Sequence, residues 1–216
     1  MKHSQNIDSF LNEKLADIWV MAETFGLKQL QDESFLQEKL PILQKRHRGA
    51  FVDLGFGNGE GMQVAYAGAF KLGRANYAEA DWFKEAVQRN HFISDVFLGI
   101  RGLPHFIVAV KKEWQGKIWI LRSSIDFVAF NTLVENIRIG RTGLAFIVNG
   151  KGEFQTNRPQ AAELDIGHYV ALMNNNNTST VTEAGLQSGG KALVLKKRNG
   201  EKRVLWAWEQ RFASAS

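Results

Sequence analysis

The apolar residues at the start of the chain recur at intervals of three and four, the spacing of one face of an α-helix. From residue 7 to residue 25 this stripe consists of Ile7, Phe10, Leu11, Leu15, Ile18, Trp19, Ala22 and Phe25. Gly26 and residues 32–34 interrupt the pattern, and a second helix is predicted over residues 35–45 despite Pro41. We therefore expect residues 1–48 to form a long helix and a second helix. The stripe is both candidate core and a candidate seam of a homodimer.

The middle of the chain, Tyr77–Asp126, predicts a short helix followed by a meander of antiparallel strands. The helical segment covers residues 77–87, and three strand-like runs follow at residues 91–100, 105–110 and 117–126. These runs are rich in Ile, Val, Phe and Trp and are separated by Gly or Pro, as expected for strands. A short helix packed on such a meander leaves a concave space between helix and sheet, which we expect to be a ligand pocket.

A glycine-rich segment, DLGFGNGEG at residues 53–61, allows two interpretations. An acidic residue followed by Gly55, Gly57 and Gly59 resembles the cofactor loop of Rossmann-like methyltransferases, which requires a helix directly after the loop. The residues that follow alternate between apolar and polar and lack helical periodicity. Asn58-Gly59 between two β-like runs is instead a strong hairpin signal. We expect a hairpin, and an S-adenosylmethionine-dependent methyltransferase remains an alternative.

The last part of the chain repeats this plan on a smaller scale. The predicted elements are a helix over residues 127–139, a strand and turn over 144–152, a helix over 161–173, a polar loop over 174–182 and a hairpin over 191–209. The fold class is therefore α+β. A helical N-terminal part, residues 1–48, is followed by two units of similar plan, residues 49–127 and 128–212.

Composition is that of a globular protein with a sizeable core: 44% of the 216 residues are hydrophobic and 23% are charged. The net charge of +5 and the isoelectric point near 9.5 raise the question of nucleic-acid binding. The basic residues are scattered, however, and no aromatic–basic interleaving forms a stacking platform, so no nucleic-acid partner is expected. The absence of cysteine excludes disulfides, thiolate metal sites and a cysteine nucleophile. Neither a signal peptide nor an apolar run of about 18 residues is visible.

Polar residues alternate with apolar ones along the run 117–126. Arg122, Ser124 and Asp126 share a strand face with Ile118 and Ile120, and this face should meet the helix. Buried opposite charges are costly unless they are paired or bound to something. Two interpretations stay open: Arg122 and Asp126 bridge each other, or Asp126 accepts from a ligand donor while Arg122 holds an anionic group.

Aromatic residues of the helix are the second part of this candidate site. Trp82 and Phe83 are expected to form an aromatic wall, with Tyr66 or Tyr77 nearby, although plain core packing explains them equally well. The polar candidates on the adjacent strands are Ser94, Asp95, Arg101 and His105. A single histidine near a Pro turn is more often a structural hydrogen-bonding group than a ligand contact.

No pattern typical of catalysis is present. The five histidines, at positions 3, 47, 91, 105 and 168, form no HExxH-type pair, and no Ser-His-Asp order stands out. No two carboxylates are singled out as a glycosidase pair. We expect no catalytic residue, metal or cofactor in this chain.

Several segments resemble one family of receptors. The run 61–68 (GMQVAYAG), Asn76-Tyr77 and Asp81-Trp82-Phe83 resemble double Cache (dCache) extracellular sensor domains. The run 93–99 (ISDVFLG), continuing through 101–106 (RGLPHF), resembles the version found in bacterial two-component sensor histidine kinases. The segment 142–149 (TGLAFIVN) resembles the first strand of that family's membrane-proximal module. The likeness extends over residues 7–210 in the right order.

The resemblance implies a long N-terminal helix and two PAS-like (Cache) modules, each an antiparallel sheet with flanking helices. The membrane-distal module would hold the ligand pocket. It also implies a periplasmic location between two transmembrane helices and a kinase beyond the C-terminus. We therefore expect this chain to be the sensor part of a longer inner-membrane protein, itself not an enzyme, that binds a small polar metabolite. A chemoreceptor or another dCache receptor is the alternative parent.

Amino-acid-binding members of the family resemble this chain in the Trp followed by an aromatic residue and in the Asp that closes the last distal strand. They also carry an Arg two residues before the Trp, and Ala80 stands there in this chain. Recognition of an α-amino acid would then need its positive charge from Arg122 or Arg101. The expected ligand is a small polar metabolite such as a carboxylate or an amine.

Overall fold

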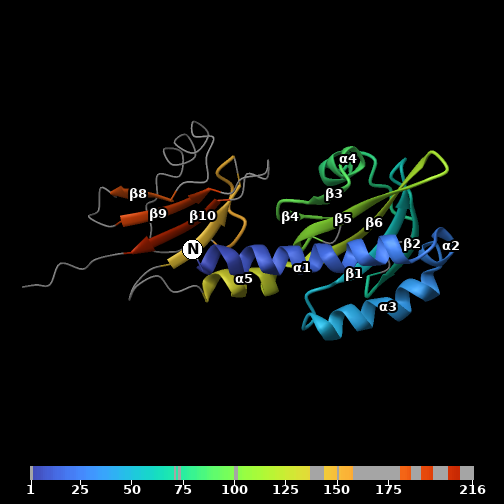
Figure 1. Cartoon of the computed structure of the whole chain (residues 1–216), viewed down its shortest axis with the longest axis horizontal. Coiled ribbons are helices and arrows are strands. Elements are labelled where there is room, and N and C mark those ends of the chain that lie inside the picture. Colours follow the sequence, from blue (N-terminus) through green and yellow to red (C-terminus); the bar gives the residue numbers. More distant parts are fainter. Residues whose placement is uncertain are drawn as a thin grey trace, which may run out of the picture. The chain divides into compact units, whose positions relative to one another are not determined.

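The computed structural model describes residues 2–70, 72, 74–99, 102–136, 144–149, 151–157, 181–185, 191–196 and 204–209. The chain divides into two compact units (Figure 1). One consists of Asp8–Ala129, and the other combines Met1–Ile7 with Phe130–Ser216. Each unit contains an antiparallel sheet and at least one helix, so the fold is α+β, as the sequence predicts.

Three helices open the chain: α1 (Lys2–Thr24), α2 (Leu27–Leu30) and α3 (Glu33–Arg46). The predicted interruptions are confirmed, since Gly26 is the N-cap of α2 and the Asp32 carboxylate caps α3 by accepting from the Ser34 N–H at 2.9 Å. Pro41 lies inside α3 with its side chain exposed. Among the described residues, none of the helices combines the length and apolar character needed to cross a bilayer.

The sheet of the first unit contains β1 (Asp53–Asn58), β2 (Gln63–Gly68), β3 (His91–Ile93), β4 (Phe97–Leu98), β5 (Pro104–Trp114) and β6 (Lys117–Asp126). The strand order is β2-β1-β6-β5-β3, with β4 also paired to β5. The glycine-rich segment is the antiparallel β1–β2 hairpin, so the predicted hairpin is confirmed. The helix that a nucleotide-binding loop requires is absent after it.

The predicted single strand over residues 91–100 is wrong. It is divided into β3 and β4 because Ser94 takes part in the ladder through its side chain. The Ser94 hydroxyl accepts from the Ile107 N–H at 2.8 Å and donates to the Asp95 carbonyl at 2.7 Å. A side chain that satisfies backbone groups in this way competes with continued strand pairing.

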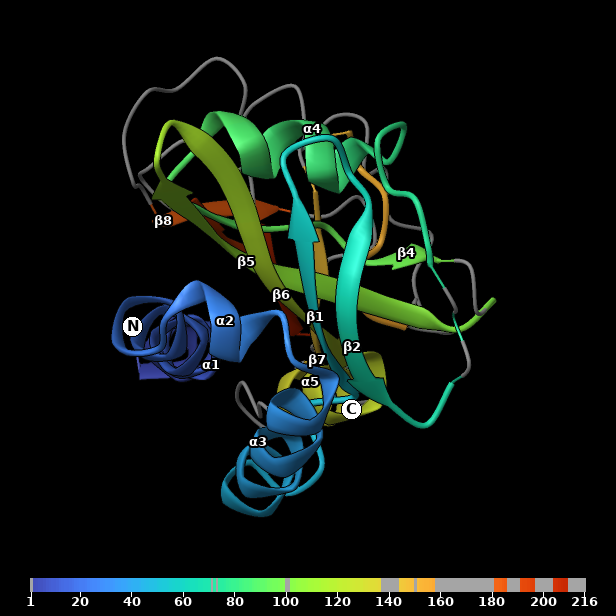
Figure 2. The ribbon, with the colours of Figure 1, turned by 90° about the vertical axis from the view of Figure 1, so that its right-hand side faces the viewer.

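Helices cover both faces of this sheet (Figure 2). Helix α4 (Asp81–Gln88) lies on one face, and α3 packs against β1 and β2 on the other. The core on the α4 side consists of Trp82, Phe83, Ala86, Ile107, Ala109 and Ile120. On the other side α3 buries Leu36, Leu40 and Leu43. The sheet is therefore enclosed, and polar groups on its α4 face are shielded from water.

The second unit contains a sheet of order β7-β10-β9-β8. Its strands are β7 (Leu144–Val148), β8 (Val181–Gly185), β9 (Lys191–Lys196) and β10 (Val204–Glu209). Helix α5 (Phe127–Glu135) precedes them, and the Asn131 side chain accepts from the Asn157 N–H at 2.8 Å. Strand β8 was not predicted, because its sequence VTEAG follows a polar stretch and carries a weak strand pattern. The helix predicted over 161–173 lies outside the described residues.

A buried polar cluster ties α1 to the end of α3. The Lys14 ammonium lies 2.8 Å from Nδ1 of His47, whose Nε2 is hydrogen-bonded to the Asp17 carboxylate. Lys14 is only 3% exposed, and the His47 side chain is also buried. Burial lowers the pKa of Lys14, and the charges of Glu13 and Asp17 only partly offset this effect.

This cluster predicts a pH-dependent stability. Because the pKa of Lys14 lies below its usual 10.5 in the folded protein, the unfolded chain binds more protons between the two values. The free energy of unfolding should therefore rise with pH through that window. In Lys14→Gln the rise should be smaller. Urea denaturation at a series of alkaline pH values measures it, with the exposed Lys45→Gln as the control. Equal slopes in the wild type and Lys14→Gln would contradict the assignment.

Candidate ligand-binding site

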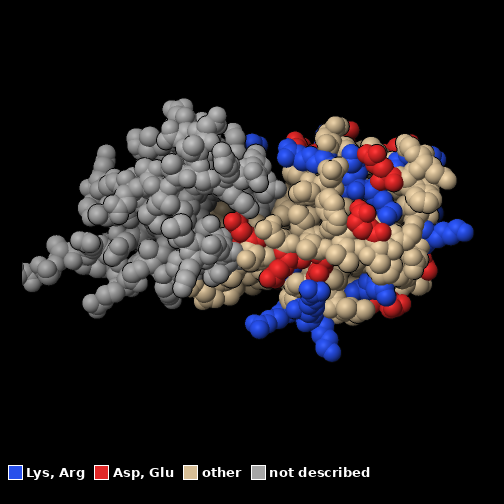
Figure 3. All heavy atoms as spheres, viewed as in Figure 1, with Lys and Arg blue, Asp and Glu red and all other residues tan. Residues whose placement is uncertain are grey.

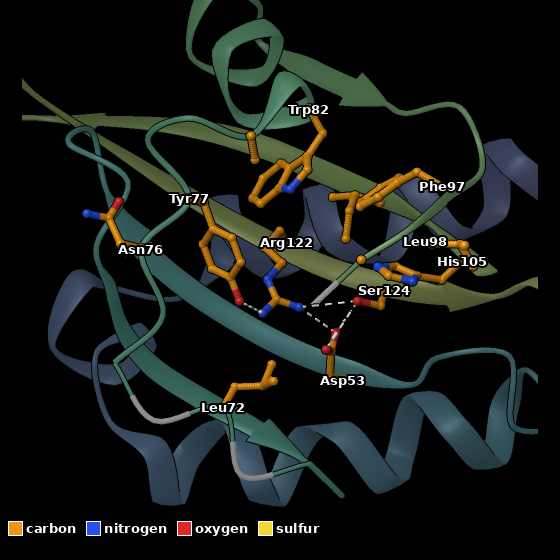
Figure 4. A pocket seen from close by; sticks show the side chains of 13 residues that line it. Asp53, Leu72, Asn76, Tyr77, Trp82, Phe97, Leu98, His105, Arg122 and Ser124 are labelled. Carbon is orange, nitrogen blue, oxygen red and sulfur yellow. Dashed lines mark hydrogen bonds and ion pairs between the residues drawn. The ribbon is translucent and has the colours of Figure 1, made fainter. Parts of the chain in front are cut away.

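A cavity of about 250 Å³ lies between α4 and the sheet of the first unit (Figure 4). Its lining comes from β1, β6, β4, β5, the segment before α4 and α4 itself. The residues are Asp53, Leu72, Asn76, Tyr77, Ala80, Trp82, Phe97, Leu98, Gly99, His105, Ile107, Arg122 and Ser124. Apolar walls with a few convergent polar groups are typical of a small-molecule site.

The polar floor of the cavity is built on a buried ion pair between β1 and β6. Nη1 of Arg122 lies 2.6 Å from Oδ1 of Asp53. Asp53 is fully buried and Arg122 is 4% exposed. Burial by itself lowers the pKa of Arg122, but the negative charge of Asp53 outweighs it, so the pKa is raised and the side chain stays charged. Removing one partner of such a buried pair typically costs about 3–5 kcal/mol.

The remaining hydrogen bonds of the guanidinium are also made within the protein. Nη1 contacts the Ser124 hydroxyl at 3.4 Å, and Nη2 donates to the Gln63 side-chain oxygen at 2.8 Å and to the Tyr77 hydroxyl at 2.9 Å. Nε of Arg122 is buried and has no hydrogen-bond partner within the described part of the chain. The terminal nitrogens are thus saturated by four acceptors, with Asp53 as the only charged one.

The carboxylate of Asp53 is equally well held. Its Oδ1 also accepts from the Ser124 N–H at 2.7 Å, and its Oδ2 accepts from the Ser124 hydroxyl at 3.1 Å. The Ser123 hydroxyl in turn donates to the Asp53 carbonyl. Strand β1 is therefore joined to β6 by side chains as well as by its backbone ladder.

Two glycines make room for this arrangement. A Cβ atom on Gly55 would lie 2.6 Å from Nε of Arg122, so the guanidinium lies directly over the β1 backbone. A Cβ on Gly68 would lie 2.4 Å from the Tyr66 hydroxyl and 2.9 Å from Cβ of Asp53. At Gly55 the glycine-rich segment thus serves a close side-chain approach instead of a nucleotide.

Tyr77 and Trp82 form an aromatic wall above the floor. The Tyr77 ring centroid lies 5.2 Å from that of Trp82, and Trp82 contacts Phe83 edge-on at 5.8 Å. Tyr77 precedes α4 and donates to the Gln63 side chain at 3.1 Å, while also accepting from Arg122. Phe83 points to a smaller space beside the cavity. Tyr66 is half-buried on β2, with its ring centroid 5.6 Å from the Arg122 guanidinium.

His105 closes the β4 side of the cavity. Its Nδ1 lies 2.8 Å from the Leu103 carbonyl, so Nδ1 carries the proton and Nε2 is the acceptor in the neutral ring. The ring packs on Phe97 at 4.7 Å, and a Cβ on Gly99 would lie 2.3 Å from it. His105 is therefore fixed by its backbone partner while still lining the cavity.

The structure brings together Trp82, Tyr77, Arg122, Ser124 and His105 of the predicted site residues, with Phe83 and Tyr66 next to them. The other three described candidates do not line the cavity. Ser94 is buried in the strand ladder, Asp95 is exposed, and Asp126 accepts from the Val128 N–H at 3.0 Å at the start of α5. Arg101 lies outside the described residues. Arg122 pairs with Asp53 and not with Asp126.

Sequence reasoning missed several members of the site. Asp53, Asn76, Phe97 and Ile107 line the cavity, and Gln63 binds the guanidinium of Arg122. Asp53 and Gln63 reach Arg122 because strands distant in sequence pair. The sequence could have indicated Asp53 as a buried, functional carboxylate, because it stands within the apolar run FVDLGF. Gln63 carried no such signal.

The surface charges outside the cavity are of both signs. On the face shown in Figure 3, basic and acidic side chains are both present over the described part of the chain. Within that part, no group of three or more His, Asp or Glu side chains is placed to hold a metal ion.

Models of known protein families do not match this chain, and a search of curated protein sequences also gave no match. Solved structures do match. One is the ligand-binding domain of the Campylobacter jejuni chemoreceptor Tlp3 in complex with 4-methylisoleucine, with a TM-score of 0.66 and 14% identity, covering 96% of this chain and 86% of that one. Another is the ligand-binding domain of the Pseudomonas aeruginosa PAO1 amino acid chemoreceptor PctC in complex with GABA. It has a TM-score of 0.66 and 12% identity, covering 96% of this chain and 94% of that one.

A third match is the extracellular domain of vpHK1S-Z8, assigned as a histidine kinase. Its TM-score is 0.69 at 10% identity, and it covers 96% of this chain and 88% of that one. The chain thus has the fold of the extracellular ligand-binding domains of chemoreceptors and histidine kinases, the Cache type. The resemblance predicted from the sequence is confirmed at the level of fold.

The close approach at Gly55 predicts a steric effect. In Gly55→Ala the new methyl group should displace the guanidinium, because Nε, Cζ and Nη2 of Arg122 all lie within 2.9 Å of its position. We expect a loss of about 1–3 kcal/mol in the free energy of unfolding, measured by urea denaturation. Gly26→Ala, whose added Cβ has no atom closer than 3.9 Å, is the control. Wild-type stability of Gly55→Ala would show that the ion pair tolerates displacement.

Proposed function

We propose that this chain is the extracytoplasmic ligand-sensing part of a transmembrane sensor histidine kinase and that it binds a small polar metabolite in the cavity under α4. The observation that carries the proposal is the cavity itself. A largely apolar space of about 250 Å³ contains a polar floor built on the buried Asp53–Arg122 pair and an aromatic wall. Extracellular domains that share this fold at low sequence identity have small molecules bound, among them 4-methylisoleucine and GABA.

In this proposal residues 49–127 form the membrane-distal Cache module and residues 128–212 form a smaller membrane-proximal one. The antiparallel sheet in each of the two units supports two modules of similar plan. The N-terminal helices, residues 1–48, would carry the conformational change toward the membrane. Such a change is limited by the difference in ligand affinity between the two conformations.

The parent protein is proposed to be a histidine protein kinase, with its catalytic part outside this chain. A chemoreceptor is the second candidate, because Tlp3 and PctC have the same fold. In either parent the sensing domain would lie outside the cytoplasm, between flanking membrane helices. The present chain would then act by binding alone.

A homodimer is also proposed. Half of the apolar stripe of α1 is buried within the chain, namely Ile7, Leu11, Ile18 and Ala22. Val20 is 59% exposed on the same helix. A seam between two copies would therefore use the outer surface of α1 around Val20, and light scattering at high protein concentration tests for it.

Ligand binding is tested by a thermal-shift screen against amino acids, amines, organic acids, their neutral analogues and S-adenosylmethionine. A ligand at a hundred times its dissociation constant adds about 2.7 kcal/mol to the stability. At ~2–4 °C per kcal/mol, the melting temperature should rise by several degrees. The shift should disappear in Trp82→Ala, which removes the aromatic wall.

Trp114→Ala is the matched control, because Trp114 is 52% exposed at the end of β5 and does not line the cavity. A shift that survives Trp82→Ala would place the ligand elsewhere and contradict the proposed site. A shift with S-adenosylmethionine alone would contradict the sensor function.

A further inference from the structure

The charged groups that line the cavity cancel each other. Among the described lining residues, the permanently charged side chains are Asp53 and Arg122, whose atoms lie 2.6 Å apart. They are 0% and 4% exposed. A ligand that brings its own charge into this space would therefore find no opposite charge that is not already paired, and an unpaired buried charge is strongly disfavoured.

The terminal nitrogens of Arg122 are not available to an anionic ligand. The Nη atoms of Arg122 already have four acceptors: Asp53, Ser124, Gln63 and Tyr77. The remaining N–H, on Nε, belongs to a side chain that lines a second space with Gly55 and Gln63, and this space is only about 10 Å³. That volume holds about one water molecule and excludes a carboxylate.

The cavity still offers neutral hydrogen-bond donors, and the one on α4 belongs to Trp82. The indole Nε1–H of Trp82 has no partner within the described part of the chain, and Trp82 projects into the cavity from α4. Apolar side chains also line the cavity, among them Leu72, Phe97 and Ile107. A neutral donor beside apolar side chains matches a carbonyl or hydroxyl oxygen on an uncharged body.

We infer that the cavity selects a small uncharged ligand, such as a primary amide or an alcohol with a branched apolar body, over a carboxylate or an amine. The inference rests on the proposed function and narrows its ligand class. The sequence by itself had pointed to a carboxylate or an amine. The geometry disfavours these two ends, because at the cavity floor each would have to compete for a charge that is already paired, Asp53 with Arg122.

Three probes on one branched skeleton test the inference: isovaleramide, isovalerate and isoamylamine. Their dissociation constants for the wild-type protein are measured by calorimetry at neutral pH. The amide should bind at least about tenfold more tightly than either charged probe, a difference of about 1.4 kcal/mol in binding free energy. Wild-type protein that binds isovalerate or isoamylamine as tightly as the amide would overturn the inference.

Charge-switch variants supply the second readout. Asp53→Asn leaves the Arg122 guanidinium without its counter-charge, so the preference should move from the amide to isovalerate. Because this buried change can prevent folding, Ala80→Arg is the parallel variant. Ala80 lines the cavity at the N-cap of α4 and is partly exposed, so an added guanidinium keeps contact with water.

Ala80→Arg should bind isovalerate at least about tenfold more tightly than the wild type does, because it adds an unpaired positive charge to the cavity. Ala80→Gln, of similar length and uncharged, should leave the wild-type order of the probes unchanged. An unchanged preference in Ala80→Arg would overturn the inference while leaving the proposed function intact. Absence of binding by all three probes to both the wild type and Ala80→Arg would overturn the proposed site itself.

Discussion

The ion pair between Asp53 and Arg122 is the interaction on which the rest of the first unit depends. It joins β1 to β6 at the centre of the sheet, and its hydrogen bonds continue to Ser124, Gln63 and Tyr77. Tyr77 in turn contacts Trp82, so the position of α4 over the sheet is coupled to the guanidinium. Because both charges are buried, the network is stable only while every member keeps its partner.

The elements of this unit were largely predictable, and the reasons are local. Period-two alternation gave β6 with its correct bounds and placed Arg122 and Ser124 on the face that meets α4. Three- and four-residue periodicity gave α1 and α3, and Asn58-Gly59 gave the β1–β2 hairpin. Each of these signals depends on residues within a few positions of one another.

Partners that depend on register between distant strands were not predictable. Arg122 lies opposite Gly55 in the β1–β6 ladder, which brings it beside Asp53, whereas sequence proximity suggested Asp126. Asp126 instead caps α5. The contact between Lys14 and His47 likewise depends on how α1 packs against α3, and neither segment alone predicts it. Gly55 stood out in the sequence as part of a glycine-rich motif. In the structure a glycine is needed there because the Arg122 guanidinium lies directly over its backbone.

The strand order has a consequence for how the cavity comes into existence during folding. The β1–β2 and β5–β6 hairpins connect residues that are close in sequence, whereas Asp53 and Arg122 are separated by 69 positions. Closing so long a loop costs chain entropy before any contact compensates for it, and such nonlocal pairings are the slow steps of folding. Neither hairpin contains the floor of the cavity by itself. The cavity is therefore complete only when β1 docks on β6, so a molecule that binds there would stabilise the native state and not its partly folded precursors.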